Sequence, residues 1–149
     1  MPIKSFRGLI TSGGLETINL HTNNGSTGYR IKKFEAMPQD PSGNSGTNVL
    51  KIFSIPQTTA TSTIEFDDNT LLAAAVISHN ASAFQYPPET VVVFDNVTFN
   101  QDIYVTQLDA DGNATACNYH IELEMVKLSL DENTVATLKD IRNIEQPSV

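Results

Sequence analysis

The chain has almost no positive charge over its central half. No lysine or arginine lies between Phe53 and Val126, whereas the same stretch carries ten acidic residues. The first 51 residues differ, because six cations there outnumber three carboxylates. Most of such a surface would repel a phosphate backbone, so nucleic acid is not an expected partner. An acidic protein partner could still meet the basic N-terminal third.

Cysteine and long apolar runs are also scarce. Cys117 is the single cysteine, which excludes an internal disulfide, and its apolar neighbours predict a small buried side chain. No apolar run approaches the roughly 18 residues that a membrane span requires. The N-terminal sequence MPIKSFRGLITSGG lacks the apolar core of a signal peptide. We therefore expect neither a membrane partner nor secretion.

Motifs for catalysis and cofactor binding are absent from the sequence. The histidines His21, His79 and His120 lie about forty or more residues apart, and no pair has the spacing of metal ligands. There is no G-x-S-x-G, P-loop or G-x-G-x-x-G sequence. Cys117 and His120 would point to opposite faces of a strand, which argues against a nucleophile and its base. We expect no catalytic residue, no cofactor and no metal, and hence not an enzyme.

Serine, threonine and asparagine take the place of the missing charge. Only 17% of the residues are charged, whereas these three polar types make up 40 of 149 residues. This composition suits strand edges, turns and hydroxyl-rich faces more than long helices. The length corresponds to one domain. We expect an N-terminal arm over residues 1–14 and a single domain over residues 15–149.

Residues 116–128 have the clearest strand pattern in the sequence. Apolar residues occupy the odd-numbered positions from Cys117 to Met125, and polar residues occupy the even-numbered ones. Side chains alternate across a strand, so one face should be buried and the other wet. A second strand is predicted over residues 101–108. The connecting DADGN sequence, residues 109–113, predicts a hairpin turn between the two strands.

Further strands are predicted along the rest of the chain. Residues 28–37 change parity midway, which a bulge near Lys32 and Lys33 would correct. The remaining predicted strands are Ile3–Ile10 and residues 15–20, 48–55, 62–66 and 90–94. Eight or nine short strands with Gly-, Pro-, Asn- and Ser-rich connections predict a mainly β fold. The expected architecture is an antiparallel β-sandwich of jelly-roll-like form, or else a barrel.

Two segments have a different pattern. Residues 71–77 (LLAAAVI) do not alternate, and they fit either a short helix or a strand buried on both faces; the neighbouring strands favour a strand. Near the C-terminus, Val135, Leu138 and Ile141 recur every three residues, with acidic residues before them and cations at the end. This pattern predicts one short C-terminal α-helix over about residues 131–143.

Acidic clusters and one basic cluster are the candidate sites. Residues 109–113 place oxygen atoms at alternate positions, as a calcium loop does, but they lack its twelve-residue length, flanking helices and final Glu, so a hairpin turn is the favoured interpretation. Glu122 and Glu124 share a face and could form a glycosidase pair, although two acids on a strand are usually only solvated. Five cations could form a docking face for an acidic partner or merely protect a strand edge: Lys4, Arg7, Arg30, Lys32 and Lys33.

Three runs of the sequence resemble a class of viral protein. They are GYRIKKFEAM (residues 28–37), DDNTLLAAAVIS (67–78) and the long run from VVVFDNVTF to TLKDIRN (91–143). These runs resemble small virion structural proteins of marine tailed bacteriophages, especially short-tailed ones. In such phages, proteins of this size are often capsid decoration or cement proteins: β-sandwich domains, commonly trimeric, that clamp the junctions between major capsid subunits.

The resemblance implies a non-enzymatic protein on the capsid surface of a virion. Its implied partners are the major capsid protein and further copies of itself, with a homotrimer favoured. The expected contacts are the N-terminal arm and the edge over residues 30–33. One alternative is a tail, fibre or host-adhesion module that binds glycans through loops such as residues 22–28 or 78–88. Another is a small enzyme on a β-sandwich.

Overall fold

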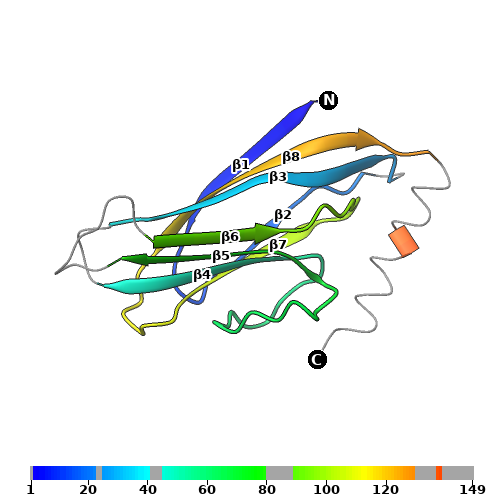
Figure 1. Ribbon diagram of the computed structural model, residues 1–149. Helices are drawn as coiled ribbons and strands as arrows, with labels where there is room; N and C mark the ends of the chain where they lie inside the picture. The colour runs from blue at the N-terminus through cyan, green and yellow to red at the C-terminus, as the bar shows by residue number, and fades with distance from the viewer. Residues whose placement is uncertain (1, 23–24, 41–44, 80–88, 130–136, 139–149) are drawn as a thin grey trace.

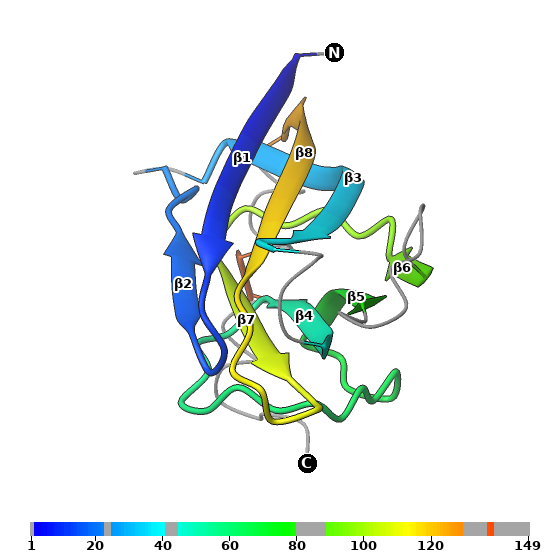
Figure 2. The ribbon, with the colours of Figure 1, turned by 90° about the vertical axis from the view of Figure 1, so that its left-hand side faces the viewer.

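The computed structural model describes residues 2–22, 25–40, 45–79, 89–129 and 137–138. Within these residues the chain is mainly β and forms two antiparallel sheets that lie one above the other (Figure 1, Figure 2). The three-stranded sheet has the order β1-β8-β3, and the five-stranded sheet has the order β2-β7-β4-β5-β6. The strands are β1 (Ile3–Ile10), β2 (Leu15–Ile18), β3 (Thr27–Pro38), β4 (Gly46–Phe53), β5 (Leu71–His79), β6 (Glu89–Phe94), β7 (Ile103–Asp109) and β8 (Cys117–Lys127).

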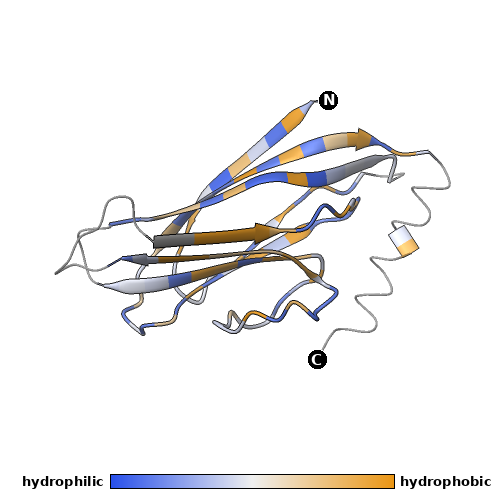
Figure 3. Ribbon diagram, viewed as in Figure 1, coloured by the Kyte–Doolittle hydropathy of each residue, from blue (hydrophilic) through white to orange (hydrophobic). Residues whose placement is uncertain are grey.

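The two sheets share one apolar core, which gives a sandwich-like arrangement. Ile121 and Leu123 of β8 are fully buried and belong to the same cluster as Leu50 and Ile52 of β4 and Val105 of β7. The alternation predicted for residues 116–128 is confirmed over most of β8, where polar positions remain partly exposed between buried ones. Figure 3 shows apolar and polar positions alternating along β8, whereas β6 is apolar over most of its length.

β3 contains the predicted bulge. Its pairing with β8 shifts between Ile31 and Lys33, so Lys32 is the additional residue on this strand. The additional residue restores the buried face, because both Ile31 and Phe34 are only 2% exposed although they differ in parity. The change of parity in the sequence was therefore a correct signal for the bulge.

The predicted hairpin between residues 101–108 and 116–128 is wrong. β7 pairs with β2 and β4, whereas β8 pairs with β1 and β3 in the other sheet. Because both edges of each strand are occupied, the DADGN segment crosses from one sheet to the other. Gly112 and Ala114 adopt positive φ angles of 78° and 56° in this connection. The local turn signal is correct, but it does not determine which strand comes to lie beside β7.

Residues 71–77 lie in a strand, β5, as the neighbouring strands favour. The strand lacks alternation because both of its faces are covered. Ala75 and Ile77 face the shared core, and Ala74, of the opposite parity, is only 5% exposed. A continuous apolar run is typical of a strand buried on both sides.

The segment between β4 and β5 crosses the outer side of the five-stranded sheet. Lys51 of β4 lies at an outward position, and its ammonium group donates hydrogen bonds to Thr61 Oγ1 and to the carbonyl oxygen of Thr63, both 2.7 Å long. The predicted strand over residues 62–66 is wrong. This segment instead covers the sheet and continues into a turn in which Asp68 N–H donates to the carbonyl oxygen of Glu65.

The sequence predicted an N-terminal arm and a C-terminal helix at the two ends of the chain. Within the expected arm, residues 1–14, the segment Ile3–Ile10 is strand β1 and pairs with β8 along its whole length. The predicted strand over these residues is confirmed. Most of the predicted C-terminal helix, residues 131–143, lies outside the described residues, although Thr137 and Leu138 have helical backbone. Within the described part of the chain, no helix has the length and apolar character to cross a membrane.

Candidate functional site

The outer face of the three-stranded sheet gathers four of the nine basic residues of the chain. Strand pairing places the outward side chains in rows that run from β1 across β8 to β3. The rows are Leu9–Asn118–Met37, Arg7–His120–Glu35, Ser5–Glu122–Lys33 and Ile3–Glu124–Arg30, with the bulged Lys32 beside the last two. These residues are called the outer face below.

Four of the five predicted basic site residues meet on this face. Arg7 comes from β1, and Arg30, Lys32 and Lys33 come from β3. Lys4 does not join them, because it pairs opposite the inward-pointing Leu123. Its ammonium group instead lies 5.6 Å from the centre of the Phe6 ring. The basic cluster predicted from the sequence is therefore largely brought together, with one member on the opposite side of β1.

Carboxylates of the outer face pair with two of these cations. Lys32 Nζ lies 3.0 Å from Glu124 Oε2, and Lys33 Nζ lies 2.9 Å from Glu35 Oε1. The hydrogen bond from Lys32 lowers the pKa of Glu124, and the hydrogen bond to Glu35 raises the pKa of Lys33. Arg7 makes no ion pair within the part of the chain that the structure describes. The outer face thus carries both cations and carboxylates, with more cations than carboxylates.

A hollow of about 620 Å³ lies at one end of the outer face. Its walls include Arg7 of β1, Glu35 and Met37 of β3, and Asn118 and His120 of β8. The other lining residues, Gly8, Ala36 and Tyr119, alternate with these along their strands. Because five of the eight lining residues lie at outward positions, the hollow opens on the outer side of the sheet. The volume lies within the range of ligand pockets, about 300–1,000 Å³.

Glycine at position 8 permits the close packing beneath the hollow. A Cβ atom at Gly8 would lie 2.9 Å from Tyr119 Oη and 3.0 Å from the Tyr119 ring. The Tyr119 hydroxyl donates a hydrogen bond of 2.6 Å to Glu16 Oε2 of β2, which links the two sheets. Burial and this contact with a carboxylate raise the pKa of Tyr119. The strand beneath the hollow is therefore held in place by a contact between the sheets.

Apolar side chains on the outer face were not identified from the sequence. Ile3, Leu9 and Met37 are 51%, 45% and 66% exposed, and all three lie at outward positions. The paired carboxylates Glu35 and Glu124 were likewise not assigned to the basic cluster. The alternation in residues 116–128 predicts a wet face on β8, but only the pairing with β1 and β3 shows which residues share it.

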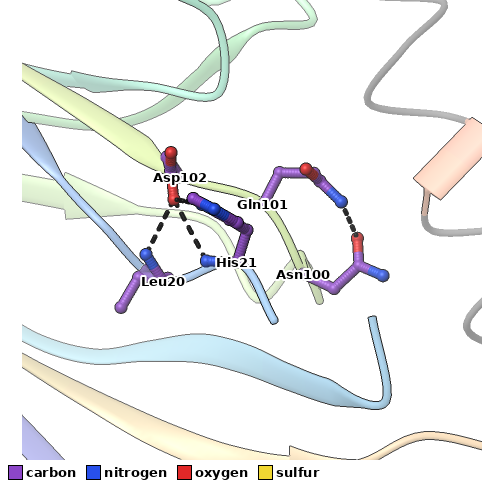
Figure 4. Close-up of polar contacts among 5 residues, drawn as sticks. All are labelled: Leu20, His21, Asn100, Gln101 and Asp102. Carbon is purple, nitrogen blue, oxygen red and sulfur yellow. Dashed lines mark hydrogen bonds and ion pairs between the residues drawn. The ribbon is translucent and has the colours of Figure 1, made fainter. Parts of the chain in front are cut away.

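The three histidines lie in separate places, as their spacing predicts. His120 is on the outer face, and His21 follows β2 at the other sheet. Figure 4 shows His21 beside Asp102, with Nδ1 of His21 2.7 Å from Asp102 Oδ1. The same oxygen accepts hydrogen bonds from the backbone N–H groups of Leu20 and His21. Burial alone would raise the pKa of Asp102, but the hydrogen bonds from His21 and Leu20 outweigh it and lower the pKa.

His79 belongs to a buried polar cluster at the end of the five-stranded sheet. His79 Nε2 lies 3.3 Å from Asn48 Nδ2, and Thr115 Oγ1 lies within hydrogen-bond distance of both Asn48 Oδ1 and Asp109 Oδ2. Asp109 Oδ1 also accepts from the backbone of Thr47 and Asp111. The oxygens of Asp109, considered above as a calcium ligand, thus accept hydrogen bonds within the crossing between the sheets.

Cys117 lies on the inward face of β8, as predicted. Its side chain is fully buried, and burial raises the pKa of the thiol to about 12. His120 is three residues further along the strand and lies on the outer face. In the described ranges, no group of three or more His, Cys, Asp or Glu residues is arranged to hold a metal ion. A scan of family models and a search of curated proteins found no match to this sequence.

Proposed function

We propose that this chain is a non-enzymatic structural protein of a virion, a capsid decoration or cement protein that binds the major capsid protein through the outer face. The observation that carries the proposal is the convergence of Arg7, Arg30, Lys32 and Lys33 on one face of a protein whose net charge is −8. Such an uneven distribution steers an acidic protein surface towards one side of the molecule.

The chemistry of the outer face supports a protein partner. Arginine and methionine are enriched at the centres of protein interfaces, and here Arg7 and Met37 line the same hollow. Exposed Ile3 and Leu9 add apolar area to the charged rows. The proposal includes a jelly-roll-like sandwich, a location on the capsid surface and a homo-oligomer, with a trimer favoured. It includes neither nucleic acid nor membrane as a partner.

Charge reversal on the outer face tests this function. Arg30→Glu combined with Lys33→Glu should weaken binding to shells of the major capsid protein by at least about tenfold, because two attractive contacts become repulsive. Lys127→Glu is the matched control, since Lys127 is exposed but lies at an inward position of β8. Co-sedimentation with shells measures the affinity, and equal binding of all three proteins would reject the outer face as the contact.

Electron cryomicroscopy of the virion distinguishes the alternative. Density for this domain at junctions between capsid subunits, with the outer face towards the shell, would support the cement function. Density on the tail or fibres would favour the host-adhesion module, and absence from the particle would reject a virion role.

A further inference from the structure

An aromatic side chain projects from a turn on the opposite side of the molecule. In the segment that covers the five-stranded sheet, residues 65–68 form a turn closed by a 3.1 Å hydrogen bond from Asp68 N–H to the carbonyl oxygen of Glu65. Phe66 lies at the tip of this turn and is 73% exposed, more than any other large apolar side chain in the described residues. Phe66 lines a small hollow together with Val93 and Phe94, which are also exposed, and such a group of exposed apolar side chains is typical of a contact site.

The turn is fixed by local hydrogen bonds. Asp68 Oδ1 accepts from both the backbone N–H and the hydroxyl of Thr70, at 2.8 and 2.6 Å, and Thr70 is buried. Asp68 also accepts a hydrogen bond from Leu71 N–H through its carbonyl oxygen. Phe66 is therefore presented on a pre-ordered turn, which lowers the entropic cost of using it in a contact.

The neighbours of Phe66 are acidic. Glu65 and Asp67 flank it directly, and both are exposed. A partner must therefore supply a hollow that accepts an aromatic ring and carries positive charge at its rim. The hollow on the outer face has both properties: Met37 contributes apolar surface, and Arg7 contributes a cation without a carboxylate partner in the described residues. The carboxylate of Glu35, which also lines the hollow, is already paired with Lys33.

We propose that the Phe66 turn of one copy docks into the hollow on the outer face of a second copy. Glu65 and Asp67 then approach Arg7, and the Phe66 ring packs against Met37. Pairing of two Phe66 turns with each other is disfavoured, because it would bring Glu65 and Asp67 of both copies together. Charge complementarity thus favours contact between the turn of one copy and the hollow of another over contact between two turns.

The geometry of the fold makes this contact head-to-tail. The turn lies on the outer side of the five-stranded sheet, and the hollow lies on the outer side of the three-stranded sheet, with the core between them (Figure 1). Each copy therefore offers one turn and one hollow. Contacts of this type produce rings if the rotation closes and open chains if it does not.

Self-association and shell binding share Arg7 and Met37, which line the hollow. Arg30, Lys32 and Lys33, the other cations of the shell contact, do not line it. The inference therefore does not depend on contacts of these three cations with the shell. Variants in the turn and the hollow leave Arg30, Lys32 and Lys33 unchanged.

Two variants and their mixture test the inference. Phe66→Ser removes the ring, and Met37→Glu places a carboxylate at the hollow to repel the acidic turn; both side chains are largely exposed, so the fold should be retained. Sedimentation velocity from micromolar to millimolar concentration should show assembly of the unmodified protein. Each variant alone should associate at least about tenfold more weakly.

The mixture is the decisive measurement. Phe66→Ser keeps an intact hollow and Met37→Glu keeps an intact turn, so together they should form a one-to-one heterodimer and nothing larger. Val91→Thr, another change of an exposed apolar residue, is the control and should assemble like the unmodified protein. An unmodified protein that stays monomeric, or a mixture that forms no dimer, would overturn the inference.

Discussion

Lys33 on β3 and Lys51 on β4 both lie at outward positions of their sheets, but their surroundings are opposite. The Lys33 side chain is 51% exposed and pairs with Glu35, which is also exposed. Lys51 is 4% exposed and lies beneath the segment that connects β4 to β5. The comparison shows that the chain covers the outer side of the five-stranded sheet at β4 with its own residues, whereas Lys33 and Glu35 on the outer side of the other sheet are exposed to solvent.

The same difference changes what a charge contributes. An exposed ion pair is screened by water and contributes about 0–1 kcal/mol. A buried ammonium group must satisfy its hydrogen bonds within the protein, and Lys51 does so with Thr61 and Thr63. Burial lowers the pKa of Lys51, opposed by Asp68 and Glu65. Charges on the three-stranded sheet are therefore suited to recognition, and the charge on the five-stranded sheet has a structural role.

The largest effect is expected where the two sheets are joined. Asp109→Ala removes a carboxylate that accepts hydrogen bonds from the backbone of Thr47, Asp111 and Thr115 and from the hydroxyl of Thr115. We expect a loss of about 3 kcal/mol in the free energy of unfolding, because several donors at a buried position lose their acceptor. Urea denaturation with a fluorescence or circular dichroism signal measures this loss.

Asp111→Ala is the matched control for this change. Asp111 is exposed, and its carboxylate accepts one 3.3 Å hydrogen bond from Thr47 Oγ1. A change within about 0.5 kcal/mol is expected, as for other surface substitutions. Equal effects of the two variants would show that the crossing does not depend on Asp109.

The two lysines give the next largest difference. Lys51→Ala should lower the free energy of unfolding by about 2 kcal/mol, because Thr61 and Thr63 lose a donor and the covering segment loses its anchor. Lys33→Ala should change it by less than about 0.5 kcal/mol. Proteolysis of residues 54–70 gives a second measurement, and only Lys51→Ala should accelerate it. If Lys33→Ala had the larger effect, the distinction between the covered and the open sheet would be wrong.

Alternation in the sequence predicts the strands whose outer side is open. β8 has one wet and one buried face, so its pattern and approximate bounds were predictable, and the change of parity revealed the bulge at Lys32. Residues 71–77 gave no such pattern because β5 is covered on both sides. The segment 62–66 was mistaken for a strand because it carries apolar residues, such as Phe66, that do not enter the core.

Strand partners were less predictable than the strands themselves. The DADGN turn is a local signal, whereas the choice between a hairpin and a crossing depends on which strands occupy the edges of β7 and β8. The same limit applies to the outer face. The sequence identified Arg7, Arg30, Lys32 and Lys33, but the pairing of β1 and β3 with β8 was needed to add Glu35 and Glu124 and to separate Lys4.

The smallest effect is on the pH dependence of stability in acid, and it compares one carboxylate from each region. Asp102 and Glu124 both have a lowered pKa, from ordinary values of 3.8 and 4.5. In each case the unfolded chain binds more protons between the two pKa values, so the stabilisation is complete above the ordinary pKa and is lost as the pH falls through the folded pKa. Asp102→Asn and Glu124→Gln should each make stability less dependent on pH below about 4.

The dependence of stability on salt concentration should differ between the two carboxylates. Asp102 is held by His21 and by backbone N–H groups at a position where its side chain is 18% exposed, so its contribution should persist at high ionic strength. Glu124 depends on Lys32, whose side chain is 45% exposed, so its contribution should shrink as salt is added. Urea denaturation between pH 2 and 6 at low and high salt, for both variants and the unmodified protein, measures the difference. Similar salt dependence at the two sites would mean that the contacts of Glu124 are as well shielded from solvent and salt as those of Asp102. The cations of the outer face would then be less available to a partner than the proposed shell contact requires.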